Sequence, residues 1–290
     1  MTQFNFEAIG TVWQIDIYQD LSVSQEKTLL SAIENRIELF DKTYSRFRSD
    51  SLVTVMSKET GRFDLPDDAE KLFTVYYDLY KRTGGLFTPL VGNLISDAGY
   101  DASYSLTQKK ELEAPPRWED ALEYHAPSLL IKQPVILDFG AGGKGYLVDL
   151  VSEVIELYNI VKYCIDAGGD ILYKNTTPIR IGLENPENTE QVIGVCTIEK
   201  GSICGSAGNR RAWGTFTHII NPKTLTSPVD VSAVWVTAET AFIADALATC
   251  LFFVEPETLA DVYTFEYVRV RSDNRVERSA GFSGEVFLEE

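Results

Sequence analysis

The sequence predicts an α+β fold, a single mixed α/β domain that covers residues 1–290. A chain of this length with a hydrophobic fraction of 44% can bury a large core. Helix-period and strand-period segments follow one another in a mixed order, without strict βαβ alternation, which favours an α+β fold or a mixed sheet. No repeat, low-complexity tract or linker divides the chain. These observations favour one domain.

The first half of the chain is predicted to contain one strand and two helices. Apolar residues alternate over 6–19, which indicates the strand. Ser22 and Gln25 resemble a capping box. The apolar stripe of the helix behind it consists of Leu29, Leu30, Ile33, Ile37 and Phe40. The second helix, which Gly84–Gly85 ends, has a stripe of core residues, namely Leu72, Val75, Tyr76, Leu79 and Tyr80. The polar segment 103–127 is expected to form short helices and loop.

The second half is predicted to alternate between strands and helices. Helices are expected over 143–158 and 238–253. Strands are expected at 129–139, which Pro134 interrupts, and at 161–166, 179–183, 192–198 and 231–237. The segment 263–282 is expected to form a hairpin around residues 272–274.

Composition excludes several classes of function. The net charge of -17 argues against nucleic acid as a partner and, without a polybasic run, against an anionic membrane surface. We find no signal peptide, lipoprotein-type cysteine or transmembrane span, so a cytoplasmic location is expected. Two histidines nearly exclude a His-rich zinc site. The four cysteines form no C-x-x-C and are expected to be buried thiols.

A glycine cluster follows the predicted strand 129–139. Gly140, Gly142 and Gly145 fit the G-x-G-x-x-G dinucleotide fingerprint, and Asp166 lies about twenty residues later. Asp138 and Lys144 are unusual in such a loop, and the chain continues as a β-rich segment. A P-loop is excluded because Lys144 is not followed by Ser or Thr. The cluster is either a tight turn without a ligand or, as the helix N-terminus and Lys144 favour, a phosphate site.

Two further groups of residues could belong to a site. Asp245 and Thr249 are four residues apart on a helix face among small apolar neighbours. They could bind Mg²⁺ together with a carbonyl and phosphate oxygens, or Asp245 could pair with an arginine while Thr249 bonds back to the helix. His218 precedes an Asn-Pro turn and could be structural or functional.

The order of these segments resembles a known family. The segments LDFGAGGKGYLVD (137–149), HIINP (218–222) and ADALATCLF (244–252) are similar to the signature segments of the ApbE family, the FAD:protein FMN transferases. AIGTVWQIDIY, YSRFRSDSLV, TGGLFTPLVGNL and IDAGGDI extend the resemblance over residues 8–252. The chain departs from the family pattern at Ile9, Ser57, Asn221 and Leu225, and GSAGNRR (205–211) matches only in part.

The resemblance implies a single α+β domain with FAD in a cleft and Mg²⁺ against its pyrophosphate. The implied metal ligands are the Asp245 carboxylate, the Thr249 side chain and the Ala141 carbonyl. Lys144 and His218 are the implied catalytic residues. The residues implied to contact FAD are Phe47, Gly85, Leu86, Phe87, Asp138, Lys144, His218 and Ile219.

The implied reaction is phosphoryl transfer to a protein. A Ser or Thr hydroxyl of an acceptor protein attacks the FMN-side phosphorus of FAD, and AMP leaves. Three alternatives stay open. Water could replace the acceptor hydroxyl, which would make the protein an FAD pyrophosphatase. The altered segments could belong to an inactive flavin-binding homologue. The glycine fingerprint could belong to an NAD oxidoreductase.

Overall fold

The computed structural model describes residues 1–287. Their main sheet has nine strands, and every pairing in it is antiparallel. Along the sheet, the order is β1 (Thr2–Ala8), β2 (Thr11–Ile17), β6 (Tyr163–Ala167), β7 (Asp170–Asn185), β8 (Asn188–Ala207), β11 (Val231–Ala238), β12 (Phe265–Arg271) and β13 (Val276–Arg278), and β14 (Gly284–Val286) also pairs with β8. The expectation of a mixed sheet is therefore wrong, while the helices and strands together confirm the α+β class.

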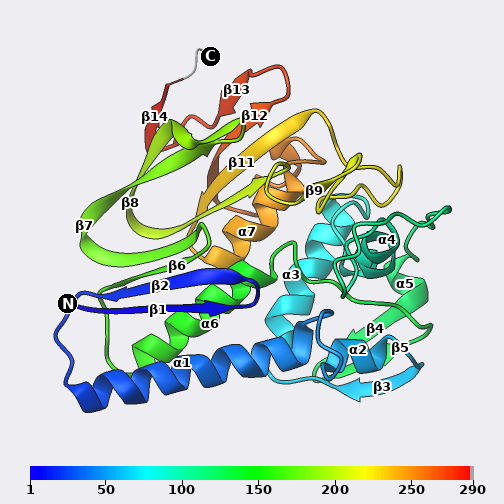
Figure 1. Ribbon diagram of the computed structural model, residues 1–290, viewed down its shortest axis with the longest axis horizontal. Helices are drawn as coiled ribbons and strands as arrows, with labels where there is room; N and C mark the ends of the chain where they lie inside the picture. Colours follow the sequence, from blue (N-terminus) through cyan, green and yellow to red (C-terminus); the bar gives the residue numbers. More distant parts are fainter. Residues whose placement is uncertain (288–290) are drawn as a thin grey trace.

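The helices pack in layers against this sheet (Figure 1). The four longest are α1 (Val23–Tyr44), α3 (Ala69–Arg82), α6 (Gly143–Leu157) and α7 (Ala241–Cys250). α7 contacts β8 and β11, α6 contacts β6, β7 and α7, and α1 packs against α6. Among the helices that residues 1–287 form, we find none with the length and hydropathy of a membrane span.

Short elements fill the side of the molecule around α3 (Figure 1). They comprise the helices α2 (Leu52–Met56), α4 (Gly92–Asp97), α5 (Trp118–Ala121), η1 (Pro89–Val91) and η2 (Pro256–Thr258). A small sheet has the order β3 (Gly61–Asp64), β5 (Ser128–Ile131) and β4 (Leu122–His125), and a second one pairs β9 (Ala212–Trp213) with β10 (Phe216–Thr217). No distinct sequence signal predicted α2, β3 or the β9–β10 pair.

Local contacts confirm the predicted start of α1 and the predicted end of α3, whereas the helix predicted over 238–253 spans only Ala241–Cys250. Ser22 Oγ accepts a hydrogen bond from the Gln25 backbone N–H (3.3 Å), and the Gln25 side chain accepts one from Ser22 N–H (2.9 Å). This capping box satisfies two amide groups at the start of α1. At the end of α3, Gly84 and Gly85 have φ of 61° and 89°, a conformation that favours glycine and ends the helix. The four cysteines are buried and free, as expected.

Two predicted strands are wrong in detail. Residues 6–19 form no continuous strand, because Ile9 and Gly10 have positive φ and turn the chain between β1 and β2. In the segment 129–139, β5 ends at Ile131 and residues 134–139 are not in a strand, since Pro134 has no backbone N–H for a ladder. The glycine cluster therefore follows a coil, and the strand that a Rossmann turn requires is missing.

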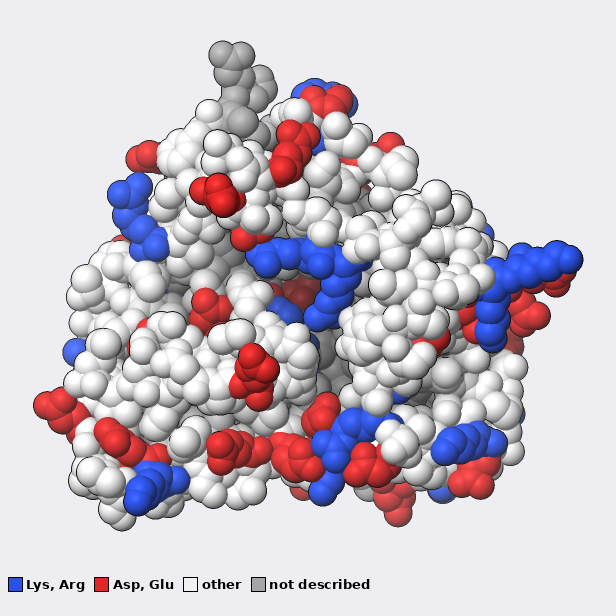
Figure 2. Space-filling model, in the orientation of Figure 1, with Lys and Arg blue, Asp and Glu red and all other residues white. Residues whose placement is uncertain are grey.

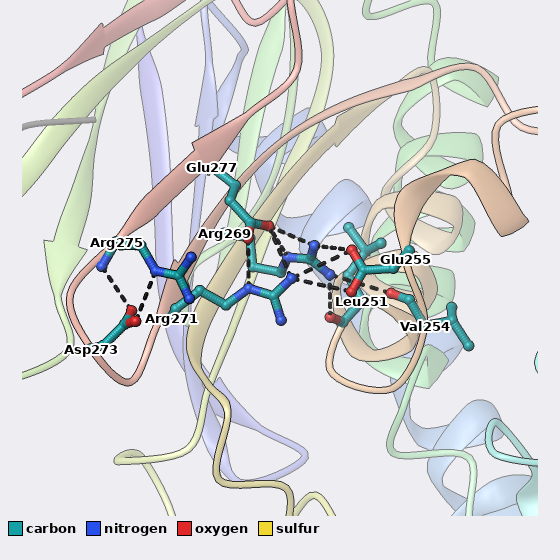
Figure 3. Close-up of polar contacts among 8 residues, drawn as sticks. All are labelled: Leu251, Val254, Glu255, Arg269, Arg271, Asp273, Arg275 and Glu277. Carbon is teal, nitrogen blue, oxygen red and sulfur yellow. Dashed lines mark hydrogen bonds and ion pairs between the residues drawn. The ribbon is translucent and has the colours of Figure 1, made fainter.

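The helix α7 is anchored at both ends. The Asp149 carboxylate on α6 accepts hydrogen bonds from the backbone N–H groups of Ala241 (2.9 Å) and Phe242 (3.1 Å). Beyond the other end, the buried Arg269 side chain donates to the carbonyls of Leu251 and Val254 (Figure 3). Glu255 and Glu277 pair with the same guanidinium. The Asp149 contacts satisfy N–H groups that a helix leaves free at its start, and together with the Arg269 contacts they fix α7 relative to α6 and β12.

Candidate active site

A cleft of about 610 Å³ opens where the helices α6 and α7 meet the sheet. Figure 2 shows this region as a hollow with Lys and Arg side chains around it and acidic side chains inside. All the predicted site residues except Gly85 line it, namely Phe47, Leu86, Phe87, Asp138, Ala141, Lys144, His218, Ile219, Asp245 and Thr249. Gly85 is the turn residue directly before Leu86.

The glycine cluster brings α6 very close to α7. A Cβ atom on Gly145 would lie 2.2 Å from the Ala241 carbonyl oxygen and 2.6 Å from Asp245 Cβ. The same approach lets the Gly145 backbone N–H donate to Asp245 Oδ2 at 2.8 Å. The spacing of these glycines favoured a phosphate ligand. At Gly145, however, the structure shows that the missing side chain makes room for the neighbouring helix.

Asp245 is a buried carboxyl group that points toward this junction. Burial, and next to it the negative charge of Asp170, raise the pKa of Asp245 to about 7. Lys144 and the Gly145 amide work in the opposite direction but do not outweigh burial. An acid in such surroundings gains from a cation, because a positive charge would stabilise its ionised form.

Lys144 projects from the first turn of α6 and forms an ion pair with Asp170 at the start of β7. Burial alone would lower the pKa of Lys144, but the charges of Asp170 and Asp245 outweigh it and keep the amine protonated. Asp170 is only 1% exposed, and its Oδ1 has no hydrogen-bond partner among the described residues. In the sequence, Asp170 was noted only as a member of the IDAGGDI segment. Its pairing with Lys144 depends on tertiary structure.

Asp138, like Asp170, forms an ion pair with a basic side chain. Its carboxylate pairs with the buried Arg46 guanidinium and accepts a hydrogen bond from the Gly140 backbone N–H at 2.6 Å. The Arg46 guanidinium also lies 4.1 Å from the centre of the Phe47 ring. One arginine thus connects the glycine loop with an aromatic wall of the cleft. Arg46 was not predicted as a site residue, because its partner lies far away in the chain.

His218 is held at the cleft by its backbone, and its ring has a free nitrogen. The His218 N–H donates to the Arg211 carbonyl at 3.1 Å, while the buried Nδ1 has no partner among residues 1–287. Burial, and next the positive charge of Arg211, lower the pKa of His218 to about 4. The imidazole is therefore neutral near pH 7 and can accept a proton.

The donor groups in the cleft fit a hard cation. Ala141, Asp245 and Thr249 all line it, and they offer carbonyl, carboxylate and hydroxyl oxygens, the ligand types that Mg²⁺ prefers. Within residues 1–287, no cluster of three or more His, Cys, Asp or Glu side chains is suited to a metal. A site built on one carboxylate would depend on substrate oxygens and water for its other ligands, which is common for Mg²⁺.

The fold and the cleft define a class of α+β proteins in which a sheet and two helices enclose a site lined by oxygen ligands and cations. Comparison with known proteins identifies the family. The ApbE family model matches residues 9–269, and the chain belongs to this family. The family places the chain among enzymes of the transferase class.

The relatives support this assignment over most of the chain. An Escherichia coli (strain K12) protein named FAD:protein FMN transferase is 21% identical over 93% of this chain and 83% of its own length. A Rhodobacter capsulatus protein of the same name is 27% identical over 65% of this chain, but the match spans only 39% of that protein. The solved structure of the flavin transferase ApbE from Vibrio cholerae superposes with a TM-score of 0.80, at 22% identity and 97% coverage of both chains.

Proposed function

We propose that this protein is a Mg²⁺-dependent FAD:protein FMN transferase, which moves FMN from FAD to a Ser or Thr hydroxyl of an acceptor protein and releases AMP. The observation that carries the proposal is the meeting of Lys144, His218 and Asp245 in one cleft, although they lie far apart in the chain. A single domain over residues 1–290 and a cytoplasmic location belong to the same proposal.

The proposed chemistry follows from the charge and protonation state of each residue. The neutral His218 accepts the proton of the acceptor hydroxyl as its oxygen attacks the FMN-side phosphorus. The bond from this phosphorus to the bridging oxygen breaks, and AMP leaves with the electron pair. Lys144 adds positive charge beside the phosphates. Asp245, Thr249 and the Ala141 carbonyl would hold Mg²⁺, which when bound neutralises charge on the diphosphate.

The proposal that FAD binds in the cleft is supported by lining residues that suit a flavin nucleotide. Phe47, Leu86 and Phe87 provide aromatic and apolar surface, while Asp138 and Ile219 line the cleft near the glycine loop and His218. Gly85 would act by holding Leu86 in place.

One assay distinguishes transfer from its alternatives. The purified protein is incubated with FAD, Mg²⁺ and candidate acceptor proteins, and the products are analysed by mass spectrometry. We expect an acceptor whose mass has increased by one FMN, together with free AMP. Free FMN and AMP with an unmodified acceptor would instead establish a pyrophosphatase, and intact bound FAD would establish a binding protein.

His218→Asn is expected to lower kcat for FMN transfer by about a hundredfold, because general base catalysis typically contributes at least that much. The KM for FAD should change little. At saturating Mg²⁺, the titration of His218 should not reduce the wild-type rate between pH 8 and pH 5, because the pKa of His218 is lowered to about 4. The measurement is a steady-state pH profile of both proteins.

The only other histidine offers a matched control. His125 lies on β4, is exposed and does not line the cleft. His125→Asn should keep the wild-type kcat. If His218→Asn also kept it, the proposed proton transfer by His218 would be wrong.

A further inference from the structure

The GSAGNRR segment is the part of the cleft that the proposed function does not yet use. It ends β8 and continues into the loop before β9, so that Arg210 and Arg211 lie at the edge of the cleft. Both arginines are exposed and line the cleft. Figure 2 shows basic side chains gathered at this hollow.

The Lys and Arg residues that line the cleft differ in whether they form an ion pair with an acidic side chain. Lys144 is paired with Asp170, and Arg210 is paired with Glu184 of β7 at 3.0 Å. Arg211 makes no ion pair with any of the described residues 1–287. A chain with 43 acidic and 26 basic residues offers many carboxylates, so an unpaired arginine at a cleft indicates a position kept free for another anion.

The surroundings of Arg211 hold its guanidinium beside the site of the chemistry. Its carbonyl accepts the hydrogen bond from His218 N–H, which ties its backbone to this residue at 3.1 Å. The guanidinium carbon lies 5.8 Å from the centre of the Tyr100 ring, within the range of a cation–π contact. Such a contact limits the motion of the side chain without using its hydrogen-bond donors.

We propose that the Arg211 guanidinium binds a phosphate oxygen of the flavin dinucleotide beside His218, and that it favours phosphorylated flavins over riboflavin. This inference rests on the proposed function, because it assumes that FAD occupies the cleft. An arginine presents a planar fork of N–H groups that matches two phosphate oxygens. Arg210 lacks this role, because Glu184 occupies its guanidinium.

The test is a binding experiment that needs no transfer. Flavin fluorescence is titrated with the protein in the presence of Mg²⁺, once with FAD and once with riboflavin. Arg211→Gln should weaken FAD binding about tenfold, the effect of one lost charge-assisted phosphate contact. Its affinity for riboflavin should stay within about twofold of wild type, since riboflavin has no phosphate. Arg211→Lys should recover part of the affinity for FAD.

Arg210→Gln is the matched control, because it removes the same charge from the neighbouring position. We expect its affinity for FAD to stay within about threefold of wild type. The inference is overturned if both variants weaken FAD binding equally, if riboflavin is weakened as much as FAD, or if Arg211→Gln binds FAD like wild type. If wild type bound FAD but transferred no FMN, the proposed function would fail while these binding comparisons still decided the role of Arg211.

Discussion

Asp245→Asn is expected to lower FMN transfer by about a thousandfold, which corresponds to about 4 kcal/mol of lost transition-state stabilisation. Asparagine has nearly the same shape, and its side-chain oxygen can still accept the hydrogen bond that Gly145 N–H gives to Asp245. The contact between α6 and α7 should therefore survive. What disappears is the negative charge that we propose as a metal ligand, so the variant should also lose its response to Mg²⁺.

The measurement is the initial rate of transfer as a function of Mg²⁺ concentration. Asp149→Asn serves as the control, since Asp149 and Asp245 are each 6% exposed but Asp149 anchors the start of α7 and lies outside the cleft. This control should lose stability and keep the wild-type Mg²⁺ concentration for half-maximal activity. An Asp245→Asn protein with unchanged Mg²⁺ dependence would show that the metal assignment is wrong.

The same carboxyl group gives a pH dependence with a defined sign. Because the pKa of Asp245 is raised to about 7, mainly by burial, the group is largely protonated at pH 6 in the absence of metal. Mg²⁺ needs the ionised form, so its apparent affinity should rise from pH 6 through pH 7 and level off above about pH 8.

Stability without Mg²⁺ should change in the opposite sense. The folded state binds the proton of Asp245 more tightly than the unfolded state, so this contribution is fully present below pH 4 and is lost as the pH rises through 7. The contribution of Asp245 is tested by measuring the thermal unfolding temperature of wild type and Asp245→Asn between pH 4 and pH 8. If the unfolding temperatures of the two proteins changed in parallel with pH, the predicted contribution would be wrong.

The parts of the fold that could be predicted depend on local signals. The capping box of Ser22 and Gln25 and the positive-φ glycines after α3 act within a few residues, and the structure confirms them. Alternation over 6–19 was misinterpreted because a tight turn at Ile9–Gly10 leaves the apolar pattern intact on both sides. A period of two cannot distinguish one long strand from a hairpin.

The site could also be predicted only where a residue stands out from its local sequence. Asp245 and Lys144 were conspicuous because each is a charged residue in an apolar or glycine-rich segment. Arg46 and Asp170 were not, because their roles depend on partners 92 and 26 residues away. Such pairings are decided by strand register and helix packing, and no local pattern encodes them.

The glycine fingerprint shows how one pattern can serve two purposes. Gly140 accommodates the turn in which its N–H reaches the Asp138 carboxylate. Gly142 and Gly145 instead face α7, where their missing side chains leave room for Ala246 and for the Ala241 carbonyl. The spacing that resembles a dinucleotide loop is therefore in part a requirement of helix packing. The effect of adding a side chain at this contact on the stability of the protein can be measured.

Gly145→Ala is expected to destabilise the protein by about 3 kcal/mol or more, at the upper end of single substitutions, because overpacking here forces backbone to move. The added Cβ would lie 2.2 Å from the Ala241 carbonyl oxygen, a rigid atom at the start of α7, and 2.6 Å from Asp245 Cβ. Relief requires α6 and α7 to separate, which would stretch the bond from Gly145 N–H to Asp245 and displace the proposed metal ligand. Activity should fall together with stability.

Gly143→Ala, two residues earlier on the same helix, separates this effect from the loss of glycine itself. Its Cβ would meet Phe139 Cβ at 3.4 Å and Phe40 Cζ at 3.7 Å, which is ordinary van der Waals contact. Alanine also favours the helix over glycine by up to about 1 kcal/mol, so this variant should be as stable as wild type or slightly more stable. Chemical denaturation of the three proteins gives the comparison. Equal stability of Gly145→Ala and Gly143→Ala would mean that the close approach of α6 and α7 is not what requires glycine at position 145.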